Sequence, residues 1–177
     1  MTEKLLEIRD LHVMYRTDDD NIFALNGVNL SVEKGKTIGL VGETGAGKTT
    51  TALSIMRLLP DKVGIIRQGE IFLEGRNLRD LSEADMRLLR GNDVSMIFQD
   101  PMTSLNPTHT VGEQIGEVVK LHYPELRSDA VEAKVDEMME MVGIPAERKT
   151  EYPHQFSGGM KQRIVIAIAL ACNPKLL

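Results

Sequence analysis

The fold of this chain can be inferred from one short stretch, Gly42-Glu43-Thr44-Gly45-Ala46-Gly47-Lys48-Thr49-Thr50 (residues 42–50). It fits the pattern G-x-x-x-x-G-K-[ST], in which a glycine-rich loop binds phosphate. The apolar residues 37–41 come before it and predict a buried strand. Residues 51–59 follow with a helical pattern that Pro60 ends. The motif therefore lies between a predicted strand and a predicted helix. This context argues against the alternative, a glycine-rich turn that matches the pattern by chance.

The residue types of this stretch suit a nucleotide phosphate. Gly45 and Gly47 let the backbone approach oxygens that a Cβ would block, and successive N–H groups then form a nest for anions. The helix that follows adds the positive end of its dipole. Lys48 is expected to contact the β- and γ-phosphates, and the Thr49 hydroxyl to hold Mg²⁺. The predicted ligands are ATP and Mg²⁺, and the predicted binding residues are Gly42, Glu43, Thr44, Gly45, Ala46, Gly47, Lys48, Thr49 and Thr50.

Composition excludes several other classes of protein. The chain has 177 residues, 42% of them hydrophobic, which is enough for one domain of ordinary size. Its net charge of −5 argues against nucleic acid as a partner. The single cysteine, Cys172, excludes an internal disulfide framework and lies in an apolar run typical of a buried side chain. No apolar run reaches transmembrane length, so we expect a soluble cytosolic chain or one that a partner holds at a membrane.

The remaining segments alternate between strand and helix patterns. Residues 5–15 and 22–32 predict two strands joined by a short polar turn, which indicates an antiparallel layer against the nucleotide core. Short apolar runs predict further strands over 70–74 and 94–98, and residues 175–177 begin another. Helical spacing predicts helices over 111–121, 131–142 and 160–171, the last with Ser157 as its N-cap. The methionines of the second helix suit a core better than a binding groove.

Two further motifs follow the phosphate loop in a fixed order. Phe98-Gln99-Asp100-Pro101 ends a predicted strand, and Phe156-Ser157-Gly158-Gly159-Met160-Lys161-Gln162-Arg163 begins a predicted helix. Over the whole chain this order resembles the nucleotide-binding domain of ABC transporters, with Gln99 at the Q-loop position and residues 157–162 at the signature motif. The sequences of residues 96–107 and 152–163 are similar to the corresponding segments of the dipeptide and oligopeptide importer ATPases, a subfamily that includes nickel importers. Thr44 stands where serine is commoner, and Phe156 where leucine is.

The resemblance implies an α/β fold: a P-loop NTPase core with an N-terminal antiparallel β layer and a helical subdomain, the C-terminal part of the sheet being missing. It divides the chain into residues 1–98 (β layer and P-loop core), 99–157 (Q-loop and helical subdomain) and 158–177 (signature helix and start of the Walker B strand). The Walker B aspartate and the glutamate that polarises water would follow Leu177. We therefore expect either a fragment of a longer product or a truncated one.

The resemblance also assigns roles in nucleotide binding and catalysis to single residues. Tyr15 would stack on adenine, although a partly buried strand tyrosine is the alternative. Lys48 and Gln99 would act in catalysis. Gln99 would reach Mg²⁺, which Thr49 also holds, and the attacking water, and it would move with the docking loop that follows it.

The signature motif implies a second anion site. Ser157, Gly158 and Gly159 would offer a hydroxyl and unblocked amides at a helix N-terminus. In the family these groups close over the γ-phosphate bound by the other subunit, so ATP joins two subunits head to tail.

The implied function is that of the ATP-binding subunit of an ABC importer, an ATPase that couples ATP binding and hydrolysis to uptake of di- or oligopeptides. Its partners would be membrane permease subunits, a second identical or related ATPase subunit and, indirectly, an extracytoplasmic solute-binding protein. It would lie peripherally at the cytoplasmic face of the cell membrane. The alternatives are import of nickel or other small cargo, or a fragment that binds nucleotide without turnover. The signature segment argues against an unrelated P-loop enzyme such as a kinase.

Overall fold

The computed structural model describes residues 3–17 and 20–177. The chain forms two compact units, Met1–Arg87 and Leu88–Leu177. The division expected from the motifs, with boundaries after residues 98 and 157, stays a prediction. Among the described residues, every helix is too short or too polar to span a lipid bilayer.

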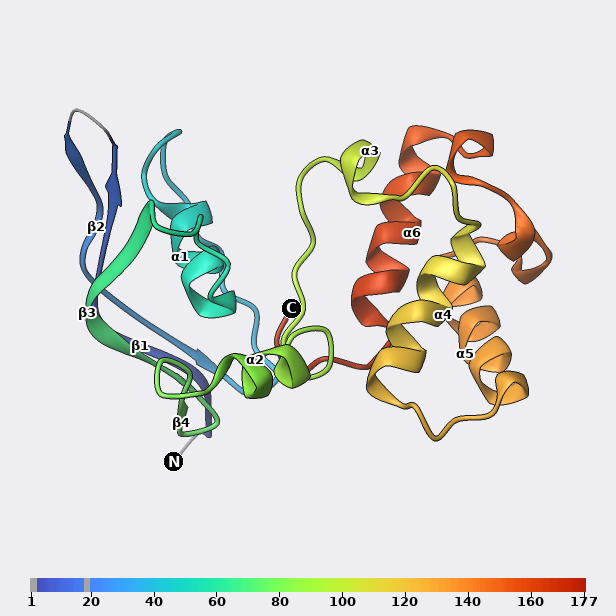
Figure 1. The fold of residues 1–177 in the computed structure, drawn as a ribbon, viewed down its shortest axis with the longest axis horizontal. Coiled ribbons are helices and arrows are strands. Elements are labelled where there is room, and N and C mark those ends of the chain that lie inside the picture. The colour runs from blue at the N-terminus through green and yellow to red at the C-terminus, as the bar shows by residue number, and fades with distance from the viewer. Residues whose placement is uncertain (1–2, 18–19) are drawn as a thin grey trace. The chain divides into compact units, whose positions relative to one another are not determined.

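The first unit is built on an antiparallel sheet with the strand order β2-β1-β3-β4 (Figure 1). Its strands are β1 (Lys4–Arg16), β2 (Asn21–Glu33), β3 (Gly64–Leu73) and β4 (Arg76–Asn77). The antiparallel pairing predicted for the first two strands is confirmed. Residues 18 and 19 of the predicted turn between them lie outside the described residues. The sheet buries apolar side chains from its central strand, namely Leu6, Ile8, Leu11 and Val13.

Residues 37–41 do not form the strand that the sequence predicts. Val41 is 93% exposed, and Ile38 and Leu40 are also exposed. In residues 3–17 and 20–177, the sheet consists of β1 to β4, and none of these strands pairs with this segment. An apolar run becomes a strand only when a neighbour satisfies its backbone hydrogen bonds, so the prediction was wrong for a non-local reason.

The strands predicted over 94–98 and from 175 onward are also wrong in extent. They are reduced to one parallel bridge between Val94 and Leu176. The Ser95 amide donates to the Leu176 carbonyl at 2.9 Å, and Lys175 forms an ion pair with Asp93 at 2.9 Å. One bridge is too short a ladder to extend either strand.

The second unit is helical. Helix α2 (Glu83–Leu89) crosses the boundary between the units. The other elements are α3 (Pro101–Ser104), α4 (Val111–His122), α5 (Ser128–Met141), the 3₁₀ turns η1 (Ala146–Thr150) and η2 (Pro153–Gln155), and α6 (Gly158–Leu170). Figure 1 shows α4, α5 and α6 grouped together. Their facing sides form the core, in which Ile115, Met138, Met139 and Ile164 are fully buried, so the core interpretation of the methionine stripe is confirmed.

Candidate functional site

The phosphate loop leads directly into helix α1 (Lys48–Met56). Gly47 is the N-cap of this helix, in the left-handed region at φ +82°, and Gly45 has φ +85°. The first intrahelical bond runs from the Thr51 amide to the Gly47 carbonyl at 2.9 Å. The first amides of a helix have no carbonyl in a preceding turn, and the N-cap Gly47 has no side chain to cap them. The helix therefore offers these N–H groups to an anion in front of it.

Strand β2 fixes the loop at Gly47, where the helix begins. A Cβ at Gly47 would lie 2.5 Å from Leu25 Cδ2 and 2.9 Å from the Ala24 carbonyl oxygen. At Gly45, by contrast, a Cβ would meet none of the described atoms within 4 Å. Gly47 is thus needed for close packing on β2, whereas Gly45 is needed for the backbone conformation alone.

Lys48 places a positive charge within the loop. Its Nζ donates to the carbonyl oxygens of Gly42 at 2.7 Å and Glu43 at 2.6 Å. The Ala46 amide donates to the Glu43 carbonyl at 3.2 Å and closes the same turn. An ammonium group held within a glycine-rich loop at the start of a helix is a fitting environment for a phosphate.

Tyr15, near the end of β1, contacts Thr50 in the first turn of α1. The two hydroxyl oxygens are 3.1 Å apart, within hydrogen-bonding distance. Thr50 is buried and Tyr15 is half-buried, whereas the neighbouring Thr49 is exposed at the helix start. The structure therefore joins the predicted adenine-stacking residue to the first turn of α1, but its stacking role stays a prediction.

Gln99 lies in the second unit, exposed, just before α3. The loop that follows it is held by Gln114, which the sequence analysis missed. Gln114 is 8% exposed, and its Oε1 accepts from the Asn106 amide at 2.9 Å. Its Nε2 donates to the Asn106 carbonyl at 3.0 Å and the His109 carbonyl at 3.1 Å. The sequence signal for it was an amide beside Ile115 on the apolar face of the predicted helix, because buried polar groups need partners.

Ser157 is the N-cap of α6, as predicted. Its Oγ accepts from the Met160 amide at 3.4 Å. Gly158 and Gly159 are exposed, and a Cβ at either would meet no described atom within 4 Å. The N-terminus of α6 therefore offers open backbone amides, as the phosphate loop does.

The candidate residues thus form two groups, one in each unit. Tyr15 and residues 42–50 belong to the first unit, and Gln99 and residues 157–159 to the second. Throughout the part of the chain that the structure describes, no group of three or more His, Cys, Asp or Glu side chains could hold a metal ion. A nucleotide-bound Mg²⁺ needs only one or two protein ligands, so the roles of Thr49 and Gln99 toward Mg²⁺ stay predictions.

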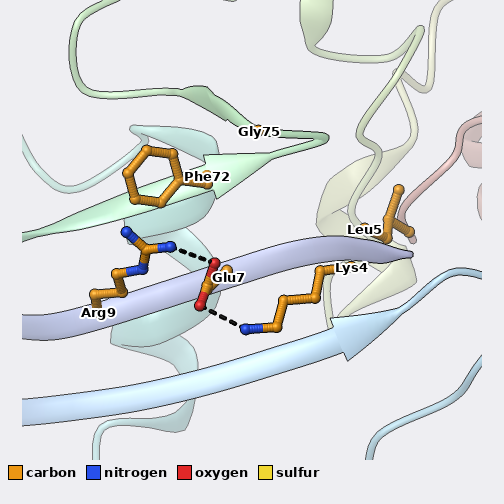
Figure 2. A pocket seen from close by; sticks show the side chains of 6 residues that line it. All are labelled: Lys4, Leu5, Glu7, Arg9, Phe72 and Gly75. Atoms are coloured by element: carbon orange, nitrogen blue, oxygen red, sulfur yellow. Dashed lines mark hydrogen bonds and ion pairs between the residues drawn. The ribbon is translucent and has the colours of Figure 1, made fainter. Parts of the chain in front are cut away.

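The first unit also has a shallow pocket on β1 and β3, away from the candidate residues. It is lined by Lys4, Leu5, Glu7, Arg9, Phe72 and Gly75 (Figure 2). Figure 2 shows Glu7 between Lys4 and Arg9, with contacts of 2.7 Å and 2.8 Å. These contacts, the one from Arg9 above all, lower the pKa of Glu7 to about 2. Arg9 also covers the Phe72 ring, 4.6 Å from its centre. The charged side chains of the pocket are engaged with one another, which favours a structural role.

The chain matches a known protein family over most of its length. Residues 25–177 match the family described as ABC transporter. The chain is 48% identical over 176 residues to the oligopeptide transport ATP-binding protein OppD of Bacillus subtilis strain 168, a match covering 98% of this chain and 49% of the relative. It is 51% identical over 175 residues to a probable peptide ABC transporter ATP-binding protein, y4tR, of Sinorhizobium fredii, covering 98% and 52%. The chain spans about half the length of the curated relatives it matches.

Solved structures of the same kind share the fold. One is a dimeric post-hydrolysis state of the ATP-binding cassette MJ0796 bound to ADP and Pi, with a TM-score of 0.83, 25% identity, and coverage of 96% of this chain and 70% of that one. Another is cbiO1 from Clostridium perfringens, part of the ABC transporter complex cbiONQ, with a TM-score of 0.77, 25% identity, and coverage of 98% and 64%. The α/β fold class predicted from the sequence is confirmed by these neighbours.

Proposed function

The chain belongs to the ABC transporter family, and on this basis we propose that it is the ATP-binding part of an importer subunit for di- or oligopeptides. The observation that carries the proposal is the phosphate loop, in which Lys48, the first residue of α1, donates from its ammonium group to the carbonyls of Gly42 and Glu43. The peptide cargo is supported by the relatives OppD, an oligopeptide transport ATP-binding protein, and y4tR, a probable peptide ABC transporter ATP-binding protein. Import of nickel or another small cargo by the same kind of subunit is the alternative.

The loop would hold ATP through its phosphates. Lys48 and the first amides of α1 would bind phosphate oxygens, and Tyr15, whose hydroxyl contacts that of Thr50 in the first turn of the helix, would stack on the base. The exposed Thr49 hydroxyl and Gln99 would hold Mg²⁺, which when bound neutralises charge on the transferred phosphoryl group. Gln99 would also orient the attacking water, because an amide both donates and accepts.

The N-terminus of α6 would act on the nucleotide of a second subunit. Ser157, Gly158 and Gly159 offer a hydroxyl and open amides, and the related cassette MJ0796 is a dimer with ADP and Pi. We therefore place a second copy or a related subunit head to tail with this one. ATP between them would join the two subunits.

The permease is the proposed partner of the loop that follows Gln99. Gln114 bonds to both ends of residues 106–109, which makes this loop rigid enough to receive a segment of a membrane protein. A solute-binding protein would deliver the peptide on the other side of the membrane. This arrangement gives the subunit a peripheral position at the cytoplasmic face.

A polypeptide limited to residues 1–177 should bind Mg-ATP weakly and hydrolyse it no faster than buffer. Hydrolysis depends on holding the phosphates in a well-positioned, charged cradle. The cradle is present, but the apolar residues 37–41 before it are exposed and pair with none of the strands that the structure describes. Because no described strand holds this segment, the backbone that leads into the phosphate loop is poorly fixed.

The test is ATP binding by the full-length protein, measured by calorimetry with Mg²⁺. Lys48→Ala should weaken binding by roughly ten- to a hundredfold, because a charge-assisted phosphate contact contributes about 1.5–3 kcal/mol. The matched control is Lys36→Ala, an exposed lysine in the turn before the loop, which should bind as the parent does. Equal affinity of Lys48→Ala and the parent would overturn the proposal, and uptake of labelled nickel but not dipeptide by cells would favour the alternative cargo.

A further inference from the structure

Arg148, in η1, bonds to the segment that leads into α6. Its Nε and Nη2 donate to the two carboxylate oxygens of Glu151, at 2.9 Å and 2.6 Å. Nη2 also lies 3.4 Å from the Gln155 carbonyl oxygen, and Nη1 lies 3.7 Å from the sulfur of Met160. The guanidinium covers the Phe156 ring, 4.3 Å from its centre. One side chain thus contacts four residues between η1 and the first turn of α6.

These contacts lie on both sides of Ser157. Phe156, directly before the N-cap, is 4% exposed, so its ring is anchored in the core of the unit. Met160, in the first turn, donates its amide to Ser157 Oγ. Because Arg148 contacts both Phe156 and Met160, it fixes the backbone direction at which α6 begins.

The geometry differs from that of an ordinary surface ion pair. Exposed pairs contribute little because water and salt screen them. Arg127 and Asp129 form such a pair in the same unit, with side chains 84% and 65% exposed. Arg148 and Glu151 are only 30% and 27% exposed. Only the planar guanidinium can combine a two-pronged carboxylate contact with stacking on a ring, so lysine would not replace it.

We propose that Arg148 is a positioning residue for the signature motif: by holding Phe156 and Met160, it orients the Ser157 hydroxyl and the amides of Gly158 and Gly159 toward the γ-phosphate of a partner subunit. The inference rests on the proposed function for its consequence in catalysis. The orientation itself is a property of this chain and can be measured without turnover.

The first measurement is amide hydrogen exchange of residues 157–160 in the full-length protein. Arg148→Lys and Arg148→Ala should both raise exchange there, Arg148→Ala more strongly. Arg127→Ala is the matched control and should leave exchange at these residues unchanged. Arg148→Lys retains the charge and most of the length, so it keeps the test valid if Arg148→Ala does not fold. Unchanged exchange in Arg148→Lys would overturn the inference.

The second measurement is ATP turnover by the same proteins. A misplacement near 1 Å can lower a rate by up to about a hundredfold, so kcat should fall roughly ten- to a hundredfold in Arg148→Ala. Binding of ATP to the separate subunit should stay unchanged, because the phosphate loop of that subunit is intact. Equal effects on affinity and kcat would indicate a general structural role and overturn the inference.

The third measurement is a double-mutant cycle with Ser157→Ala. If Arg148 acts by orienting Ser157, Arg148→Lys should cost less kcat in the Ser157→Ala background than in the parent, since residues coupled through a backbone shift are not additive. Full multiplication of the two losses would contradict the positioning role. Absence of turnover in the parent would overturn the proposed function instead, while hydrogen exchange would still decide the role of Arg148.

Discussion

Alanine at Gly47 should damage the phosphate loop far more than alanine at Gly45, although both glycines have a positive φ. The two angles are nearly equal, +82° and +85°. Each substitution forces an L-residue into the left-handed region, at a cost of about 1–2 kcal/mol. The two positions differ only in what the new methyl group meets.

The structure gives the size of that difference. At Gly47 the new Cβ would lie 2.5 Å from Leu25 Cδ2 and 2.9 Å from the Ala24 carbonyl oxygen. Leu25 is 4% exposed and has little room to move, and the carbonyl belongs to β2. Overpacking of this kind costs about 1–3 kcal/mol. We therefore expect a total near 2–5 kcal/mol for Gly47→Ala, against about 1–2 kcal/mol for Gly45→Ala.

Native-state hydrogen exchange of the amides in α1 and β2 measures this loss locally, in the full-length protein. Calorimetry with Mg-ATP gives the accompanying loss of affinity. Gly45→Ala serves as the control, because it shares the strained φ but not the close contact. Equal losses of local stability in the two variants would show that the packing of Gly47 on β2 does not position the loop.

Two further predictions follow from contacts elsewhere in the chain. Gln114→Met keeps the volume but removes the partner of the Asn106 backbone N–H and C=O, so it should lower the free energy of unfolding by about 1–3 kcal/mol and speed hydrogen exchange over 106–110. Unchanged exchange there would contradict the proposed rigidity of the loop. The pKa of Glu7 is lowered from 4.5 to about 2 by Arg9 first and then Lys4, so its stabilisation is present above pH 4.5 and is lost as the pH falls toward 2. Glu7→Gln should remove that part of the acid dependence of stability, and an acid-unfolding profile identical to that of the parent would refute it.

Local signals in the sequence were sufficient for much of this fold. The alternation of Leu6 and Ile8 in β1, and the spacing of Val111 and Ile115 in α4, each reflect one buried face, so both elements were predicted. Residues 37–41 have an equally apolar pattern, yet they form no strand, because a strand depends on a neighbour that a local pattern does not reveal.

In the candidate site, too, the features with a local sequence signal were predicted and those that depend on tertiary contacts were not. The phosphate loop was recognised because its glycines and lysine specify the backbone and the charge directly. The contact of Gly47 with β2 is tertiary and had no signal in the motif. Arg148 was missed because it lies in an irregular 3₁₀ segment without hydrophobic periodicity, where a charged residue is normally read as surface. Gln114 was missed because it lies beside Ile115 in an apolar stripe, and the stripe predicts a buried face without indicating the role of a polar residue within it.

The strand order β2-β1-β3-β4 has a consequence for how the first unit folds. The hairpin of β1 and β2 is local, with Tyr15 opposite Ile22, and can form as soon as β2 exists. Strand β3 must return to the other edge of β1, where Ile71 pairs with Ile8, after the whole phosphate loop and α1 have been passed. Closing so long a loop costs chain entropy before its contacts compensate, so we expect β3 to join late. The phosphate loop and α1, which would hold the nucleotide, lie in the connection that this late pairing closes. They therefore reach their final conformation only after β3 has paired with the hairpin of β1 and β2.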